Sequence, residues 1–238
     1  MIRIQSLSLR TLATTALVLG SAARSASGQH YGLREVKDAG MFGVNLALGA
    51  PDGEFARNVD VAGGIDAFAA VNVGRGSPVA LRLEGAYLVY GSDHVFVPQS
   101  FAAQLNTTYS IATVGVGPQI TVGQGPMRLY GFGTVGVSYI STYSSFGPDG
   151  CGCNGYNSLT DFSDWAAAFQ VGGGMLLRLG RHSPVALDLG ARYLYSGFAN
   201  YVAPGDVQPQ TNGDIVVFTS RARPNLTEFH IGVSIGIR

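Results

Sequence analysis

Apolar residues alternate with small or polar ones through eight segments of this chain. The segments are residues 40–50, 59–73, 79–90, 108–122, 127–139, 164–179, 185–195 and 226–238. Successive side chains of a β-strand point to opposite faces, so a period of two predicts eight strands that each have one apolar face. Each segment is at least as long as the roughly 9–11 residues that a tilted strand needs to cross a bilayer. The pattern therefore predicts an all-β fold.

The connections between these strands alternate between short and long. Three are tight glycine- and proline-containing turns, at residues 74–78 (GRGSP), 123–126 (GQGP) and 180–184 (GRHSP). The other four are polar and longer, at residues 51–58, 91–106, 144–163 and 196–225. When both chain ends lie on one side of a barrel, this order places all the long loops on the opposite side. The connections predict a closed up-and-down antiparallel transmembrane β-barrel of eight strands.

The beginning of the chain predicts export. Arg3 and Arg10 precede a short apolar stretch at residues 12–20, and small residues follow up to Gln29. This order is typical of a signal peptide, and the stretch is shorter than the about 20 residues of a membrane-spanning helix. We expect a cleaved signal peptide at residues 1–28, a periplasmic lead-in at residues 29–39 and an outer-membrane barrel at residues 40–238.

Composition restricts the class of protein further. Charged residues make up 13% of the chain, against roughly 25% in soluble domains, yet residues 29–238 contain no apolar run long enough for a membrane helix. Without residues 1–28, 12 basic residues remain against 15 acidic ones, a net charge of −3. This charge excludes a strongly basic nucleic-acid-binding protein. We expect no nucleic-acid partner.

Alternation alone fits both a soluble barrel, with its apolar face inward, and a membrane barrel, with its apolar face outward. The polar face here consists mainly of small residues, its charges are balanced between arginines and acids, and Lys37 is the only lysine. These features favour an enclosed polar face. We predict an ion network in the lumen, formed by Asp66, Arg82, Glu84, Arg128, Arg178, Asp188, Arg192, Glu228 and His230.

Aromatic residues on the apolar face gather near the loop ends of the strands. They are Tyr87, Tyr139, Trp165, Tyr193 and Phe229. Aromatic side chains of this kind form girdles where a membrane barrel meets the interface, so we predict that these five form one.

The export signal, the eight strands, the turns and segments such as residues 114–119 (VGVGPQ) together resemble the small outer-membrane β-barrel family, the OmpA/OmpX-like group. The resemblance covers residues 40–238. It implies an outer-membrane location and roles in anchoring, adhesion, immune evasion or, rarely, lipid enzymology. The chain departs from the family at its end, because Ile237 and Arg238 stand where a terminal aromatic is common.

Few residues point to chemistry. Cys151 and Cys153 fit a loop disulfide, a strained redox pair or part of a soft-metal site. Glu228, His230 and Ser234 share a face, but His230 and Ser234 are roughly 13 Å apart at about 3.3 Å per residue, too far for a catalytic triad. We therefore expect no catalytic residue, metal or cofactor.

The predicted function is a non-enzymatic, monomeric outer-membrane barrel with a structural, adhesion or surface-interaction role. Its expected partners are outer-membrane lipids and an unidentified extracellular partner at the long loops. In the last loop we expect an extra strand from residue 215. Four apolar residues there are candidates either for contact with a partner or for packing of the loop on itself: Phe198, Tyr201, Val217 and Phe218. Two alternatives remain: a lipid-modifying enzyme similar to lipid A deacylases, and a soluble ligand-carrying barrel, which would need large apolar side chains filling a cavity and a lysine-rich exterior.

Overall fold

The protein is described from a computed structural model, which covers residues 38–74, 77–96, 104–123, 125–147, 157–180, 183–204, 206–209 and 215–237. All of them belong to one compact unit, Val36–Arg238. The predicted signal peptide, most of the lead-in, and Cys151 and Cys153 lie outside the described residues. In the described part, no helix is long and apolar enough to span a membrane.

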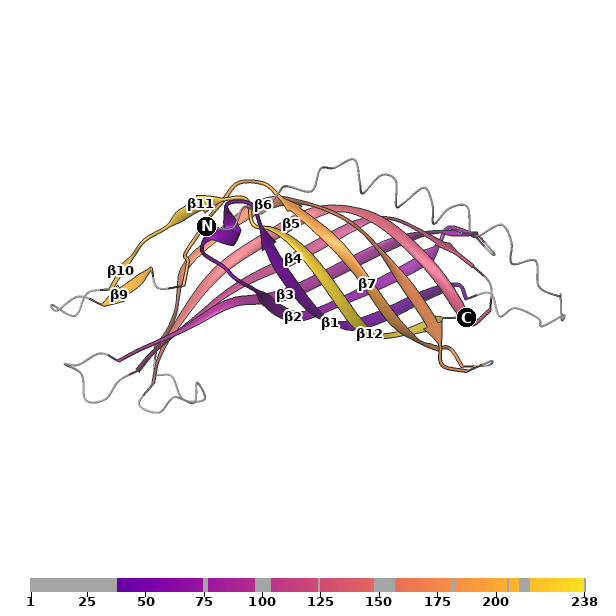
Figure 1. Cartoon of the computed structure of the whole chain (residues 1–238), viewed down its shortest axis with the longest axis horizontal. Helices are drawn as coiled ribbons and strands as arrows, with labels where there is room; N and C mark the ends of the chain where they lie inside the picture. Colours follow the sequence, from indigo (N-terminus) through magenta and orange to yellow (C-terminus); the bar gives the residue numbers. More distant parts are fainter. Residues whose placement is uncertain are drawn as a thin grey trace, which may run out of the picture. The chain divides into compact units, whose positions relative to one another are not determined.

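Eight long antiparallel strands close into a barrel (Figure 1). They are β1 (Gly40–Asp52), β2 (Ala62–Asn72), β3 (Val79–Phe96), β4 (Gln104–Val122), β5 (Met127–Gly147), β6 (Asn157–Arg178), β7 (Val185–Ser196) and β12 (Asn225–Ile237). Each pairs with its neighbour in sequence among the eight, and β12 pairs with β1, where Val233 faces Val44. The predicted fold class is confirmed.

Four strands continue beyond their predicted ends on the side of the long loops. Their residues at positions 91–96, 104–106, 144–147 and 157–163 were expected to belong to loops, because the long connections there are polar. The period of two persists there, and Thr107 and Ser144 face each other inside the barrel with their hydroxyls 2.9 Å apart. Two shifts of register, at Val89/Gly91 and Thr142/Tyr143, interrupt the pairing in this region.

The connection from β1 to β2 contains the 3-10 helix η1 (Phe55–Arg57). The side chain of Phe55 is fully buried and packs edge-on against Tyr90 and Tyr201. Val59 follows η1 and is also buried. The prediction that Val59 begins the second strand on its outer face is wrong, because the chain folds over the loop-end opening before β2 starts at Ala62.

The connection from β7 to β12 contains two small sheets near the same end of the barrel (Figure 1). Strand β8 (Ala199–Tyr201) pairs with β11 (Ser220–Ala222), and β9 (Val207–Pro209) pairs with β10 (Ile215–Val217). The extra strand expected from residue 215 is therefore present as β10. Tyr201 was a candidate either for partner contact or for packing within the loop; it is buried and accepts a hydrogen bond from Asn58, as the second alternative requires.

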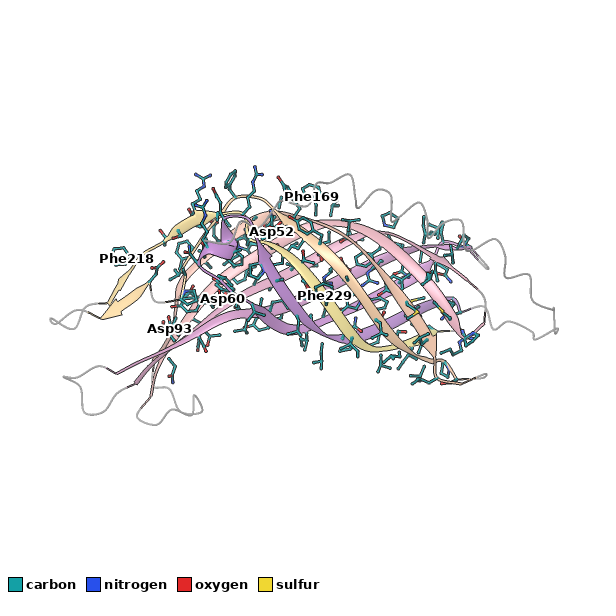
Figure 2. The ribbon with its side chains drawn as sticks, in the orientation of Figure 1. Asp52, Asp60, Asp93, Phe169, Phe218 and Phe229 are labelled. Carbon is teal, nitrogen blue, oxygen red and sulfur yellow. The ribbon has the colours of Figure 1, made fainter. Side chains whose placement is uncertain are left out.

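The outer face of the wall is apolar. Leu46, Leu81, Val116 and Val171 are each exposed by more than 40%, and the residues between them along each strand turn inward. Among the predicted girdle residues, Tyr87, Trp165 and Phe229 are exposed, whereas Tyr139 and Tyr193 are partly buried. Tyr139 packs against Trp165 with the ring centres 4.6 Å apart. Figure 2 shows Phe169 and Phe229 projecting from the wall.

The inner face is less dominated by small residues than the sequence suggested. A large apolar cluster fills the loop end of the lumen; its bulkiest members are Phe55, Leu88, Tyr90, Tyr109, Ile111, Ile140, Leu194, Tyr201 and Leu226. A smaller cluster lies towards the tight turns and contains Met41, Phe68, Tyr130, Phe132 and Leu176. Side chains inside the barrel can therefore fill the lumen at both ends, as expected for eight strands.

Candidate functional site

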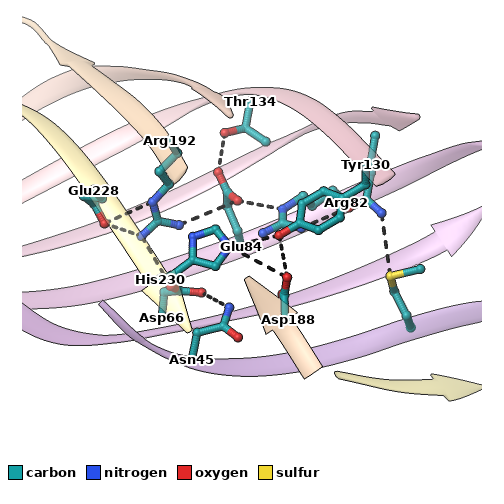
Figure 3. Close-up of polar contacts among 12 residues, drawn as sticks. Asn45, Asp66, Arg82, Glu84, Tyr130, Thr134, Asp188, Arg192, Glu228 and His230 are labelled. Atoms are coloured by element: carbon teal, nitrogen blue, oxygen red, sulfur yellow. Dashed lines mark hydrogen bonds and ion pairs between the residues drawn. The ribbon is translucent and has the colours of Figure 1, made fainter. Parts of the chain in front are cut away.

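Between the two apolar clusters lies a layer of charged side chains, which we call the charged layer: Asp66, Arg82, Glu84, Asp188, Arg192, Glu228 and His230 (Figure 3). All seven are at most 5% exposed. They come from β2, β3, β7 and β12, on positions that the strand period turns inward. The sequence predicted each of them as a lumen residue.

Arg192 lies at the centre of this layer. Its Nε and Nη2 donate hydrogen bonds of 3.0 and 2.6 Å to Oε2 of Glu228, the residue directly opposite on β12. The same guanidinium lies 3.9 Å from Asp66 and 3.8 Å from Glu84. One cation therefore holds three buried carboxylates together.

Glu84 connects Arg192 to the second buried arginine. Arg82 donates a 2.7 Å hydrogen bond to Oε2 of Glu84, and the Thr134 hydroxyl donates one of 2.6 Å to the other oxygen. The Arg82 guanidinium also donates to Gln119 and lies 3.9 and 4.1 Å from the ring centres of Phe68 and Phe132. These aromatic faces attract the cation where it emerges from the charged layer into the apolar cluster.

His230 contacts Tyr130 and Asp188 in the charged layer rather than the pair formed by Arg192 and Glu228. Its Nε2 lies 2.9 Å from the hydroxyl of Tyr130, which donates a 2.7 Å hydrogen bond to Asp188. The predicted ion network grouped His230 with Glu228 and Arg192, but these two bind each other instead. A histidine held by a tyrosine and an acid stabilises the interior without offering a nucleophile.

The arrangement does not favour hydrolysis. On β7, Gly190 lies opposite His230, and Ser196 is six positions further towards the loop end. At about 3.3 Å per residue, this places Ser196 roughly 20 Å from His230 along the strand. Within the described residues, no group of three or more histidine, cysteine or acidic side chains is arranged to hold a metal ion.

Two of the predicted network residues lie elsewhere. Arg128 and Arg178 each approach the same Oδ2 atom of Asp38, at 3.3 Å, close to the tight turns. The charge balance inferred from the sequence therefore does not hold for the charged layer, which contains two arginines and four acids. Asp38 was not expected as a partner because it precedes the first strand.

Several neutral partners of the charged layer were also missed. Asn45 donates a 2.8 Å hydrogen bond to Asp66, and Gln119 and Tyr130 bind Arg82 and Asp188 as described. The period of two places all three on the inner face. Their partners depend on the stagger between strands, which the period does not define.

The chain matches no known protein-family model and no curated protein. Its fold is similar to those of solved structures. The attachment invasion locus protein Ail of Yersinia pestis is 11% identical, with a TM-score of 0.42 over 84% of this chain and 99% of Ail. Neisserial surface protein A is 14% identical, with a TM-score of 0.47 over 84% of this chain and 97% of that one.

A major outer membrane protein of Thermus thermophilus is 12% identical, with a TM-score of 0.45 over 83% of this chain and 98% of that one. At these identities the likeness concerns the fold alone. The chain itself folds as a closed antiparallel barrel of eight strands, which its strand order establishes independently of these comparisons.

Proposed function

We propose that this protein is a non-enzymatic integral membrane barrel of the outer membrane, whose long connections act at the cell surface. The observation that supports it best is the orientation of the wall. Apolar side chains such as Leu46 and Val171 cover the outside, while Arg82, Arg192 and four acids are buried inside. In water this exposure of apolar surface would be unfavourable, whereas in a bilayer it is the favourable arrangement.

Closure of the sheet supports the same proposal. Backbone N–H and C=O groups in hydrocarbon must find partners within the protein, which a closed barrel provides without any free edge. Pairing of β12 with β1 over 13 residue pairs, from Gly40 with Ile237 to Asp52 with Asn225, satisfies this requirement.

The filled lumen supports a role other than transport. Apolar clusters lie on both sides of the charged layer, and the side chains of Tyr109, Ile111 and Leu194 at the loop end are fully buried. We propose that the barrel anchors its surface connections and conducts no ions. Exposed Phe198 and Phe218, in the connection from β7 to β12, are candidates for contact with a surface partner.

Two measurements test the membrane assignment. After cell fractionation, the protein is expected in the outer-membrane fraction and should be released only by detergent. On gels, unboiled samples should migrate differently from boiled ones, because a closed barrel stays folded until it is heated. Recovery in the soluble periplasmic fraction would overturn the proposal.

A separate experiment tests the surface role. Cells displaying the full chain are compared with cells displaying a variant in which a short glycine-serine linker replaces residues 206–218. Weaker adhesion of the variant, with an unchanged gel shift, is the expected result. Equal adhesion of the two strains to every surface tested would refute a role for this segment.

The lipid-modifying enzyme remains the second candidate. It would require a nucleophile and a histidine near the outer leaflet, whereas His230 is buried in the charged layer with Tyr130 and Asp188. Overexpression should leave the acylation of lipid A unchanged; altered acylation that depends on His230 would favour the enzyme.

A further inference from the structure

Two arginines lie on the outside of the barrel at the edge of its apolar surface. Arg221 belongs to β11, Arg223 follows that strand, and both side chains are exposed. Ala222 between them is buried, so the two guanidinium groups lie on the same outer side of the chain. Their positions contrast with those of the arginines in the charged layer, which are enclosed.

The two arginines share an aromatic support. The guanidinium carbon of Arg223 lies 4.3 Å from the ring centre of Phe198, and that of Arg221 lies 5.6 Å from the same ring. Arg223 also donates a 2.8 Å hydrogen bond to the hydroxyl of Tyr195. Stacking on a ring face leaves the edge of a guanidinium, with its N–H donors, available for an anion.

Strand pairing fixes the height of this arginine pair on the wall. Arg221 lies opposite Asn200, whose backbone N–H binds Asp164, the neighbour of Trp165. Tyr195, the partner of Arg223, lies opposite Phe169 on β6. The arginine pair therefore lies at a height between the exposed aromatic residues Trp165 and Phe169, at the loop-side border of the apolar surface.

Below this border the wall is uncharged. From Phe169, Tyr195 and Phe229 down to the tight turns, the outward residues of β6, β7 and β12 are aliphatic, aromatic, glycine or methionine. Phe169 and Phe229 project from this part of the wall (Figure 2). The arginine pair thus occupies the height at which lipid acyl chains end and headgroups begin.

The nearby acid Asp164 forms no direct ion pair with either arginine among the described residues. Asp164 acts electrostatically on Arg221, but its carboxylate accepts three hydrogen bonds, from the backbone of Trp165 and from the backbone and side chain of Asn200. Among the ion pairs of the described residues, none contains Arg221 or Arg223.

We propose that Arg221 and Arg223, supported by Phe198 and Tyr195, bind the phosphate of an anionic membrane lipid whose acyl chains lie along Phe169 and Phe229. Charge-assisted hydrogen bonds from two guanidinium groups fit a phosphate well. This inference rests on the proposed membrane insertion of the barrel. It also names the class of lipid that the arginine pair would select, an anionic lipid with a phosphate headgroup.

The test uses the full chain folded in detergent micelles and native mass spectrometry to count bound lipids. The probes are dioleoyl phosphatidic acid and dioleoylglycerol, which share their acyl chains and differ in the phosphate. The wild type is expected to retain phosphatidic acid at least about tenfold more strongly than dioleoylglycerol. Salt should weaken this preference, because it screens exposed charges.

The variant R221Q/R223Q should lose most of the preference, and R221K/R223K should retain part of it. The matched control is R57Q, which removes an exposed arginine of η1 and should bind like the wild type. Trp165, the only tryptophan, gives a second readout: its fluorescence should change with phosphatidic acid in the wild type but not in R221Q/R223Q.

Inorganic phosphate separates a lipid site from a general anion site. Displacement of phosphatidic acid by millimolar inorganic phosphate, or equal binding by R221Q/R223Q and the wild type, would overturn the proposal. The gel shift of unboiled samples is measured in parallel. If the wild type shows the gel shift but no preference for phosphatidic acid over dioleoylglycerol, the lipid site alone is refuted. If the wild type shows no gel shift, the membrane barrel itself is refuted.

Discussion

Glu228 on β12 lies directly opposite Arg192 on β7, and two hydrogen bonds of 3.0 and 2.6 Å join its Oε2 atom to the guanidinium. Arg192 also holds Asp66 and Glu84, so the two members of the pair are not equivalent. Without Arg192, three buried acids would lose their shared cation. Without the charge of Glu228, Arg192 would keep two acidic neighbours.

We therefore predict that R192Q destabilises the barrel more than E228Q. Breaking a buried ion pair costs about 3–5 kcal/mol, which is the loss expected for R192Q, whereas E228Q should cost about 1–3 kcal/mol. Urea unfolding in lipid vesicles, followed by the gel shift, measures both. Exposed Arg57 provides the control R57Q, and a larger effect of E228Q would contradict the assigned roles.

The surplus of acids in the charged layer leads to a second contrast. Glu84 binds Arg82 and Thr134 and lies near Arg192, so E84Q should destabilise by about 2–4 kcal/mol. Asp188 binds the Tyr130 hydroxyl through one oxygen, which an asparagine can replace. We expect D188N to change the free energy of unfolding by less than about 1 kcal/mol. The same unfolding assay measures both variants. Equal losses of stability would contradict the conclusion that Glu84 is needed to balance the arginines and Asp188 is not.

Close packing of strands inside the wall gives a third prediction. A Cβ atom at Gly136 would collide with the carbonyl of Val114 and lie 2.7 Å from the Cα atom of Gly115. Gly131 on the same strand faces outward, and an added Cβ there would meet nothing closer than 3.8 Å. G136A should lose about 1–3 kcal/mol or fail to fold, while G131A should fold normally. The fraction of unboiled, shifted protein after refolding distinguishes the two.

Asp38 holds two arginines near the tight turns, where Arg128 and Arg178 remain 18% and 15% exposed. Partial exposure weakens such pairs, so D38N should destabilise by roughly 1 kcal/mol and by less at high salt. Asp60 is exposed, and D60N serves as the control. A loss that does not depend on salt would indicate that Asp38 acts through packing rather than charge.

The sequence predicted the barrel well because the period of two and the tight turns are properties of short segments of the chain. A residue such as Val233 or Arg192 reveals its face through the period of two, and the tight turns reveal the order of the strands. Strand ends were predicted less well, since the polar residues around Thr107 and Ser144 resemble a loop although they alternate as a strand. Their hydrogen bond becomes visible only when β4 and β5 are paired.

Contacts inside the lumen were only partly predictable. Parity identified Arg192 and Glu228 as inward, but the stagger of the strands decides which residues meet at one height. The link from Asp38 to Arg128 and Arg178 joins positions 90 and 140 residues apart. Phe55 was assigned to a loop, and its burial depends on the turn of η1 over the barrel end.

The central claim is that the apolar face of the wall meets lipid. Cysteine labelling at Val233 tests it most directly, in vesicles and with Cys151 and Cys153 replaced by serine. V233C should react with a membrane-soluble maleimide and resist a water-soluble one, whereas F218C, exposed near β10, should react with the water-soluble reagent. Rapid reaction of V233C with the water-soluble maleimide, at the rate of F218C, would contradict the account.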